Sequence, residues 1–194
     1  MNEVVLKLKP ENVWKEFQGI MGVPRPSKRE EKMVAYLEKW AKDHKVEYKK
    51  EPCGNIIMSV PATKGMENRQ TVILQAHMDM VCEKNGDKVH DFDKDPIEAV
   101  LKGEWLHANG TTLGADDGIG VAAALAVITD KNVKHGPIEC IFTVDEETGL
   151  TGAMKLDPKD FTGRILLNLD SEDEGEIFIG CAGGMDTIVK IFYK

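Results

Sequence analysis

The stretch TVILQAHMD, residues 71–79, indicates both the fold class and the place of the functional site. It opens with Val72 and Ile73 in a β-prone, almost entirely apolar run, as expected of a strand covered on both faces in an α/β sheet. It ends in His77 and Asp79. Residues two apart in an extended segment point the same way, so the carboxylate can orient the imidazole or stabilise its charge.

Further carboxylates follow other predicted strands or precede a predicted helix. They are Asp116 in GTTLGADDGIG (110–120), Glu146 and Glu147 at the end of PIECIFTVDEE (137–147), and Asp170 at the end of RILLNLD (164–170). A tightly packed apolar helix is expected directly after the first of these stretches, over residues 121–130. Because open α/β sheets keep their sites at the carboxyl ends of strands, we expect these side chains to converge.

A metal ion explains this convergence better than separate structural roles for the single residues. An aspartate at a helix start usually caps the helix, and a glutamate pair is usually solvated. Several ionised carboxylates gathered at one edge, however, need a compensating positive charge. Oxygen and imidazole ligands without cysteine suit zinc, manganese or cobalt, and repeated carboxylates suggest two ions bridged by one of them. Since neighbouring side chains diverge, one of Glu146 and Glu147 could bind metal while the other takes the proton from a water molecule.

The same stretches resemble one protein family. LQAHMDMV, GTTLGADDGIG, EETGLTGA and NLDSEDEGEIFIGCAGG are similar to motifs of the aminoacyl-histidine dipeptidases, also called cytosol non-specific dipeptidases or peptidase D. This branch belongs to a zinc peptidase superfamily with carnosinases, aminoacylases and carboxypeptidases. The resemblance covers nearly all 194 residues, as the N-terminal part of the family's chain. It implies a three-layer α/β/α zinc-exopeptidase catalytic domain with a mixed, largely parallel central sheet, incomplete at the C-terminus.

The resemblance also implies a set of metal ligands. His77 and Asp170 would bind one zinc ion, Glu147 would bind a second, and Asp116 would bridge the two. The peptide bond between Asp116 and Asp117 would be cis. Cobalt or manganese could substitute for zinc.

Two further residues receive catalytic roles from the same resemblance. Glu146 would activate the bridging water as general base and acid, and Asp79 would orient His77. The resemblance implies a di-zinc peptidase that hydrolyses dipeptides, both Xaa-His and others, including β-alanyl-histidine. The family's last zinc ligand is a histidine in a later part of a longer chain, and no residue here matches it. The 194-residue chain alone is therefore expected to be inactive.

The domain organisation follows from the same comparison. Residues 1–184 would be the N-terminal portion of the catalytic domain. Residues 185–194 alternate in polarity like a strand, which would be either the last catalytic strand or the start of a lid and dimerisation domain. The full-length protein is expected to be a homodimer.

Composition fits one cytoplasmic globular domain. At 42% hydrophobic residues the chain can bury a core, and no stretch is apolar enough to span a bilayer or to serve as a signal peptide. The net charge of −8 argues against nucleic acid or an anionic membrane as partner. The four cysteines are far apart, so reduced, buried thiols are expected.

Local patterns predict the remaining elements. A helix is expected over 10–20, strands over 46–50 and 55–61, and a hairpin over 97–107 that turns at Lys102-Gly103. Ser27 and Glu30 have the spacing of a capping box before a second helix.

Two other functions stay open at this stage. The chain could belong to a sister branch that hydrolyses N-acyl amino acids or acts as a carboxypeptidase, or it could be a non-catalytic metal-binding fragment. A phosphate site in the glycine-rich loop is disfavoured because the loop lacks the lysine of a P-loop.

Overall fold

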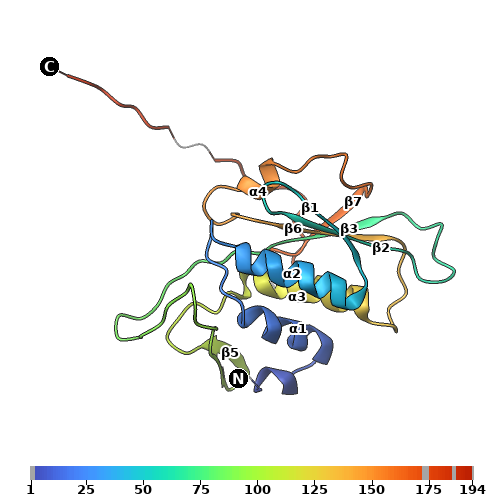
Figure 1. The fold of residues 1–194 in the computed structure, drawn as a ribbon, viewed down its shortest axis with the longest axis horizontal. Helices are drawn as coiled ribbons and strands as arrows, with labels where there is room; N and C mark the ends of the chain where they lie inside the picture. The colour runs from blue at the N-terminus through green and yellow to red at the C-terminus, as the bar shows by residue number, and fades with distance from the viewer. Residues whose placement is uncertain (1–2, 172–174, 185–186, 194) are drawn as a thin grey trace.

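The computed structural model describes residues 3–171, 175–184 and 187–193. The helices are η1 Val5–Lys7, α1 Glu11–Met21, α2 Glu31–His44, α3 Ala115–Thr129 and α4 Thr151–Met154. The strands are β1 Glu47–Lys50, β2 Ile56–Val60, β3 Val72–His77, β4 Ala99–Lys102, β5 Trp105–Ala108, β6 Ile138–Thr143 and β7 Ile165–Asn168. Figure 1 shows α1, α2 and α3 on one side of the main sheet and α4 on the other.

The main sheet has the strand order β1-β2-β6-β3-β7. Strand β3 pairs in parallel with β6 and β7, whereas β2 is antiparallel to both β1 and β6. The predicted mixed, largely parallel sheet is therefore confirmed. The register places His77 beside Thr143, and Gln75 beside Asn168. The carboxyl ends of β6, β3 and β7 consequently meet at one edge, where the loops with the candidate residues begin.

Most of the hydrophobic core lies between the sheet and the three longer helices. Leu74 and Ala76 of β3 belong to the same buried cluster as Val121 of α3 and Phe17 of α1; α3 contacts β3, and α1 packs against α3. The opposite face carries a smaller cluster of Ile57, Ile73 and Ile141, against which Leu156 and Phe161 pack. Strand β3 is thus covered on both faces, as its apolar sequence predicts.

Several predicted elements appear within a residue or two of their expected bounds. The helix predicted over 10–20 is α1, the strands predicted over 46–50 and 55–61 are β1 and β2, and the hairpin is β4 with β5, paired through Lys102 and Trp105. The helix predicted over 121–130 is α3, but α3 begins earlier, at Ala115. Its first turn contains two residues with non-helical backbone angles, Asp116 and Asp117.

The predicted capping box is wrong. Helix α2 follows Glu30, but no side chain caps its N-terminus. The Ser27 hydroxyl donates instead to the Asp79 carboxylate, and Glu30 Oε1 accepts from the backbone N–H groups of Lys28 and Asp145. Both side chains make contacts outside the helix, so the local pattern predicted the wrong partners.

The predicted strand over 185–194 is not found in its described part, because residues 187–193 form neither helix nor strand. Residues 185, 186 and 194 lie outside the described residues. An alternating segment becomes a strand only when a neighbour completes its hydrogen bonds, and side chains such as Ile188 and Phe192 are exposed here. The domain assignment of this segment stays a prediction.

All four cysteines are free thiols, as expected. The expectation of burial is confirmed only for Cys140, since Cys53 and Cys82 are half-buried and Cys181 is exposed. Within the described part of the chain, no helix has the length and apolar character needed to cross a membrane.

Candidate metal centre

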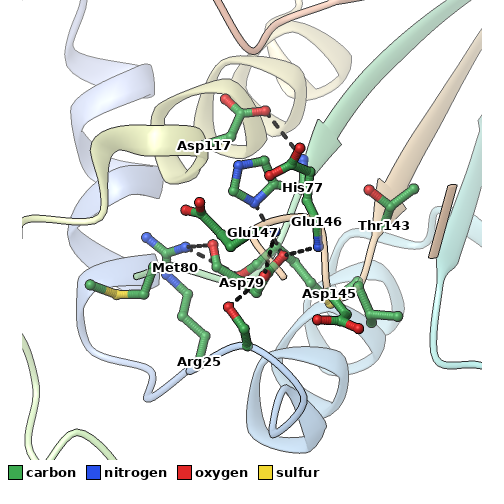
Figure 2. Close-up of polar contacts among 12 residues, drawn as sticks. Arg25, His77, Asp79, Met80, Asp117, Thr143, Asp145, Glu146 and Glu147 are labelled. Carbon is green, nitrogen blue, oxygen red and sulfur yellow. Dashed lines mark hydrogen bonds and ion pairs between the residues drawn. The ribbon is translucent and has the colours of Figure 1, made fainter. Parts of the chain in front are cut away.

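His77 stands at the centre of the site, at the carboxyl end of β3. Its side chain is 1% exposed, and both ring nitrogens have a carboxylate partner; Figure 2 shows His77 between Asp79 and Asp117. Nε2 lies 2.8 Å from Asp116 Oδ1, and Nδ1 lies 3.2 Å from Asp79 Oδ1. The backbone N–H of His77 donates to Asp117 Oδ2 at 3.2 Å. Backbone and ring together fix the direction in which Nε2 points.

Three predicted ligands come together around that nitrogen. Ligand atoms of His77, Asp116 and Asp170 all lie within 4.8 Å of one another, a grouping that could hold a metal ion. His77 Nε2 and Asp170 Oδ2 are 4.0 Å apart. The Asp116 side chain is 57% exposed and that of Asp170 is 29% exposed, so an ion can reach them from solvent. Imidazole with carboxylate oxygens is a donor set that zinc accepts.

Asp79 lies behind His77 as a completely buried carboxylate. Its Oδ1 accepts from the His77 ring and from the backbone N–H of Glu146, and its Oδ2 accepts from Ser27 Oγ and the backbone N–H of Glu147. Burial acts to raise the pKa of Asp79, but the hydrogen bonds from His77, Glu146 and Ser27 outweigh it and lower the pKa. One carboxylate thus orients the histidine and anchors the loop after β6.

Glu146 and Glu147 are half-buried and lie in that loop. Burial, reinforced by the carboxylates of Asp170 and Glu147, raises the pKa of Glu146 against an opposing effect of His77. Burial and the nearby Asp116 raise the pKa of Glu147. Neither glutamate belongs to the grouping of three ligand atoms. A raised pKa makes a glutamate a better proton acceptor, which suits a general base.

The protonation of His77 reflects the same surroundings. Burial acts to lower the pKa of His77, but hydrogen bonds with Asp79 and Asp116 outweigh it and raise the pKa to about 9. A metal ion would take the place of that proton, since only neutral imidazole is a ligand.

Asp117 is a buried residue of the site that the sequence singled out without a role of its own. The peptide bond between Asp116 and Asp117 is cis, as the resemblance implies. The Asp117 side chain is 1% exposed and folds back toward Gly120, where any Cβ would collide with its carboxylate. Burial and the neighbouring Asp170 raise the pKa of Asp117 to about 7.

Sequence reasoning also missed the supports of this site in the segment 25–30. Ser27 contacts Asp79, and Glu30 holds the backbone of Asp145 at the start of the loop with the two glutamates. The Asp145 side chain in turn accepts from the hydroxyls of Thr148 and Thr151. The one signal in the sequence was the capping-box spacing of Ser27 and Glu30, which pointed to these residues but predicted a helix cap instead of contacts with the site.

Comparison with known proteins places this geometry in a family. Residues 73–184 match the sequence profile of peptidase family M20/M25/M40. The cytosol non-specific dipeptidase of Escherichia coli strain K12 is 52% identical over 180 residues, which cover 93% of this chain and 37% of that protein. The chain therefore spans little more than a third of the length of this relative.

Solved structures agree with the sequence match. The crystal structure of aminoacylhistidine dipeptidase from Vibrio alginolyticus superposes with a TM-score of 0.86 at 49% identity, over 90% of this chain and 36% of that one. Aminopeptidase PepT from Bacillus cereus ATCC 10987 gives a TM-score of 0.71 at 31% identity, over 84% of this chain and 44% of that one. The expected fold class is confirmed by these neighbours. The chain belongs to peptidase family M20/M25/M40.

Proposed function

We propose that this chain is the N-terminal portion of a di-zinc metallopeptidase that hydrolyses dipeptides, both Xaa-His and others. The observation that carries the proposal is the convergence of His77, Asp116 and Asp170 ligand atoms within 4.8 Å, with Asp79 behind the histidine. The names of two relatives, a cytosol non-specific dipeptidase and an aminoacylhistidine dipeptidase, support the substrate class.

The donor set fits zinc, with cobalt or manganese as substitutes. His77 and Asp170 would hold one ion, Asp116 would bridge to a second, and Glu147 would bind the second. When bound, such ions polarise the carbonyl oxygen of a peptide bond and lower the pKa of a water molecule. A histidine outside this chain would complete the second site.

The protein side chains supply orientation and proton transfer. Asp79 accepts the Nδ1 proton of His77, which leaves Nε2 as the ligand atom on the side of Asp116. Glu146 would take the proton from the attacking water and pass it to the amine that leaves. Its raised pKa suits a group that must hold a proton between these two steps.

The other properties of the whole protein belong to the same proposal. Residues 1–184 would be part of its catalytic domain. Residues 185–194, of which 187–193 form no strand in this structure, would belong to the last catalytic strand or to the start of a lid and dimerisation domain of the whole protein. A homodimer that acts on small peptides in the cytoplasm is proposed, and the word cytosol in the name of the Escherichia coli relative supports the location.

The test is performed on the full-length protein with Glu146→Gln and Glu147→Gln. Glu146→Gln should keep its zinc but lose turnover by roughly 10²- to 10⁴-fold, because the proton acceptor is gone. Glu147→Gln should lose zinc, because a metal ligand is gone. Glu104→Gln, on the exposed turn between β4 and β5, is the control and should keep both zinc and turnover. Zinc content and hydrolysis of Xaa-His dipeptides are measured in parallel with hydrolysis of N-acyl amino acids.

Two results would contradict the proposal. If Glu146→Gln keeps nearly full turnover, Glu146 is not the general base. A wild-type protein that hydrolyses N-acyl amino acids and leaves dipeptides intact would belong to the sister branch.

A further inference from the structure

Arg25 is a buried arginine whose guanidinium binds backbone carbonyl groups next to the metal centre. The residue is 2% exposed. Its Nη1 donates to the carbonyls of Met78 at 3.2 Å and Asp79 at 2.7 Å, and its Nη2 donates to the carbonyl of Gly114 (Figure 2 shows the Arg25 side chain beside Asp79). The carboxylates of Asp79, Asp117 and Asp116 favour the charged form of this arginine through space. Its hydrogen bonds, however, go to main-chain carbonyls, so the guanidinium also holds the backbone at defined points.

The three carbonyls belong to the two segments that carry metal ligands. Met78 and Asp79 directly follow His77 at the end of β3, and Gly114 precedes Asp116 by two residues at the start of α3. His77 and Asp116 are 39 residues apart in the chain but only 2.8 Å apart at their ligand atoms. The planar, rigid fork of an arginine can fix the spacing of two such segments, whereas a flexible lysine offers one point charge.

The glycines of GTTLGADDGIG make room for this side chain. A Cβ on Gly118 would lie 2.6 Å from Arg25 Nη2, and a Cβ on Gly114 would also collide with it. Gly114 has a φ of 69°, in the left-handed region that favours glycine. The close passage of the guanidinium therefore explains the glycines at positions 114 and 118, on either side of Asp116.

The backbone of the same segment is attached independently of the guanidinium. The carbonyl of Arg25 accepts from the N–H of Met80 at 3.1 Å, Pro26 and Met80 form an isolated parallel bridge, and Ser27 donates to Asp79. A shortened or altered side chain at Arg25 can therefore lose its carbonyl contacts while the segment stays in place.

We propose that Arg25 is a positioning residue of the metal centre, which sets the distance between His77 and Asp116 by holding the backbone on both sides. The inference rests on the proposed function to the extent that this centre binds zinc. It assigns the arginine no contact with metal or substrate.

The experiment measures zinc affinity of the 194-residue chain by calorimetry, with circular dichroism and thermal unfolding to verify the fold. Arg25→Lys keeps the charge but cannot reach both segments. Its affinity for the zinc ion held by His77, Asp116 and Asp170 should therefore fall about 10- to 100-fold, as for other residues that support metal ligands. Arg29→Lys makes the same chemical change in the same segment. Because Arg29 is exposed and pairs with Asp93, its affinity should stay at the wild-type value.

Two more variants separate positioning from general stability. Leu37→Ala truncates a buried core residue of α2 and should lower the melting temperature without changing zinc affinity. Gly118→Ala places a methyl group of α3 against the Arg25 guanidinium and displaces it. This variant should therefore lower the zinc affinity as Arg25→Lys does. The double variant should show no further loss, because both changes act on one contact.

The outcomes are distinct. Wild-type affinity in folded Arg25→Lys, an equal loss in Leu37→Ala, or additive losses in the double variant would each overturn the positioning role. If Arg25→Lys does not fold, Gly118→Ala decides, and its unchanged affinity would overturn the role. A wild-type chain that binds no zinc would overturn the proposed function itself.

Discussion

Asp79→Asn is the change with the most direct consequence for this site. The carboxylate accepts four hydrogen bonds, from the His77 ring, Ser27 Oγ and the backbone N–H groups of Glu146 and Glu147. Asparagine keeps one acceptor oxygen and replaces the other by a donor, so two of the four donors lose their acceptor. At about 1–3 kcal/mol for each unsatisfied buried donor, the cost reaches about 2–6 kcal/mol. If the Ser27 hydroxyl rotates and accepts instead, one unsatisfied donor remains, and the expected loss of unfolding free energy falls to about 1–3 kcal/mol.

The assay combines urea unfolding of the metal-free chain with zinc calorimetry. Besides the loss of stability, zinc affinity should fall about 10- to 100-fold, because His77 is no longer held in one orientation. Asp43→Asn changes an exposed carboxylate paired with Lys39 and should alter neither quantity. An Asp79→Asn chain with wild-type stability and wild-type zinc affinity would refute the role of Asp79 as the support of His77.

Other perturbations follow from the same contacts. Ser27→Ala removes one donor to the buried Asp79 carboxylate and should lower the unfolding free energy by about 1.5–3 kcal/mol, whereas Ser59→Ala on the exposed side of β2 should not; urea unfolding of both variants checks this. The folded-state pKa values of His77, about 9, and Asp117, about 7, both lie above their unfolded values. The folded metal-free chain therefore binds more protons than the unfolded chain, and its stability should fall as pH rises from about 4 to about 9; a flat or rising urea midpoint over this range contradicts the assignment. Zinc at about 100 times its dissociation constant should raise the unfolding free energy by about 2.7 kcal/mol, a gain that a chelator should remove.

The sequence predicted the parts of the site that depend on strand ends. Apolar runs located β3, β6 and β7, and because parallel strands end at one edge, His77 and Asp170 were expected to meet. Asp116 was placed at a helix start, where the structure has the non-helical first turn of α3. These predictions depend on local periodicity and on a general rule of sheet topology, which one sequence is enough to apply.

The supports of the site depend on contacts between distant segments, which no local pattern encodes. Ser27 and Glu30 have capping-box spacing, yet their partners Asp79 and Asp145 lie 52 and 115 residues away. Arg25 has no periodic signal, and its burial follows only from the backbone carbonyls that surround it. A segment such as 187–193 shows the converse, since an alternating pattern without a neighbouring strand forms no strand.

Zinc titration of the 194-residue chain tests the central claim most directly. His77, Asp116 and Asp170 give one site three protein ligands, which a zinc ion with one open position requires. The second site has only Asp116 and Glu147 among the ligands proposed within this chain. Calorimetry should therefore show one tightly bound zinc ion and a second that binds much more weakly. Two equally tight sites, or no tight zinc at all, would contradict the account.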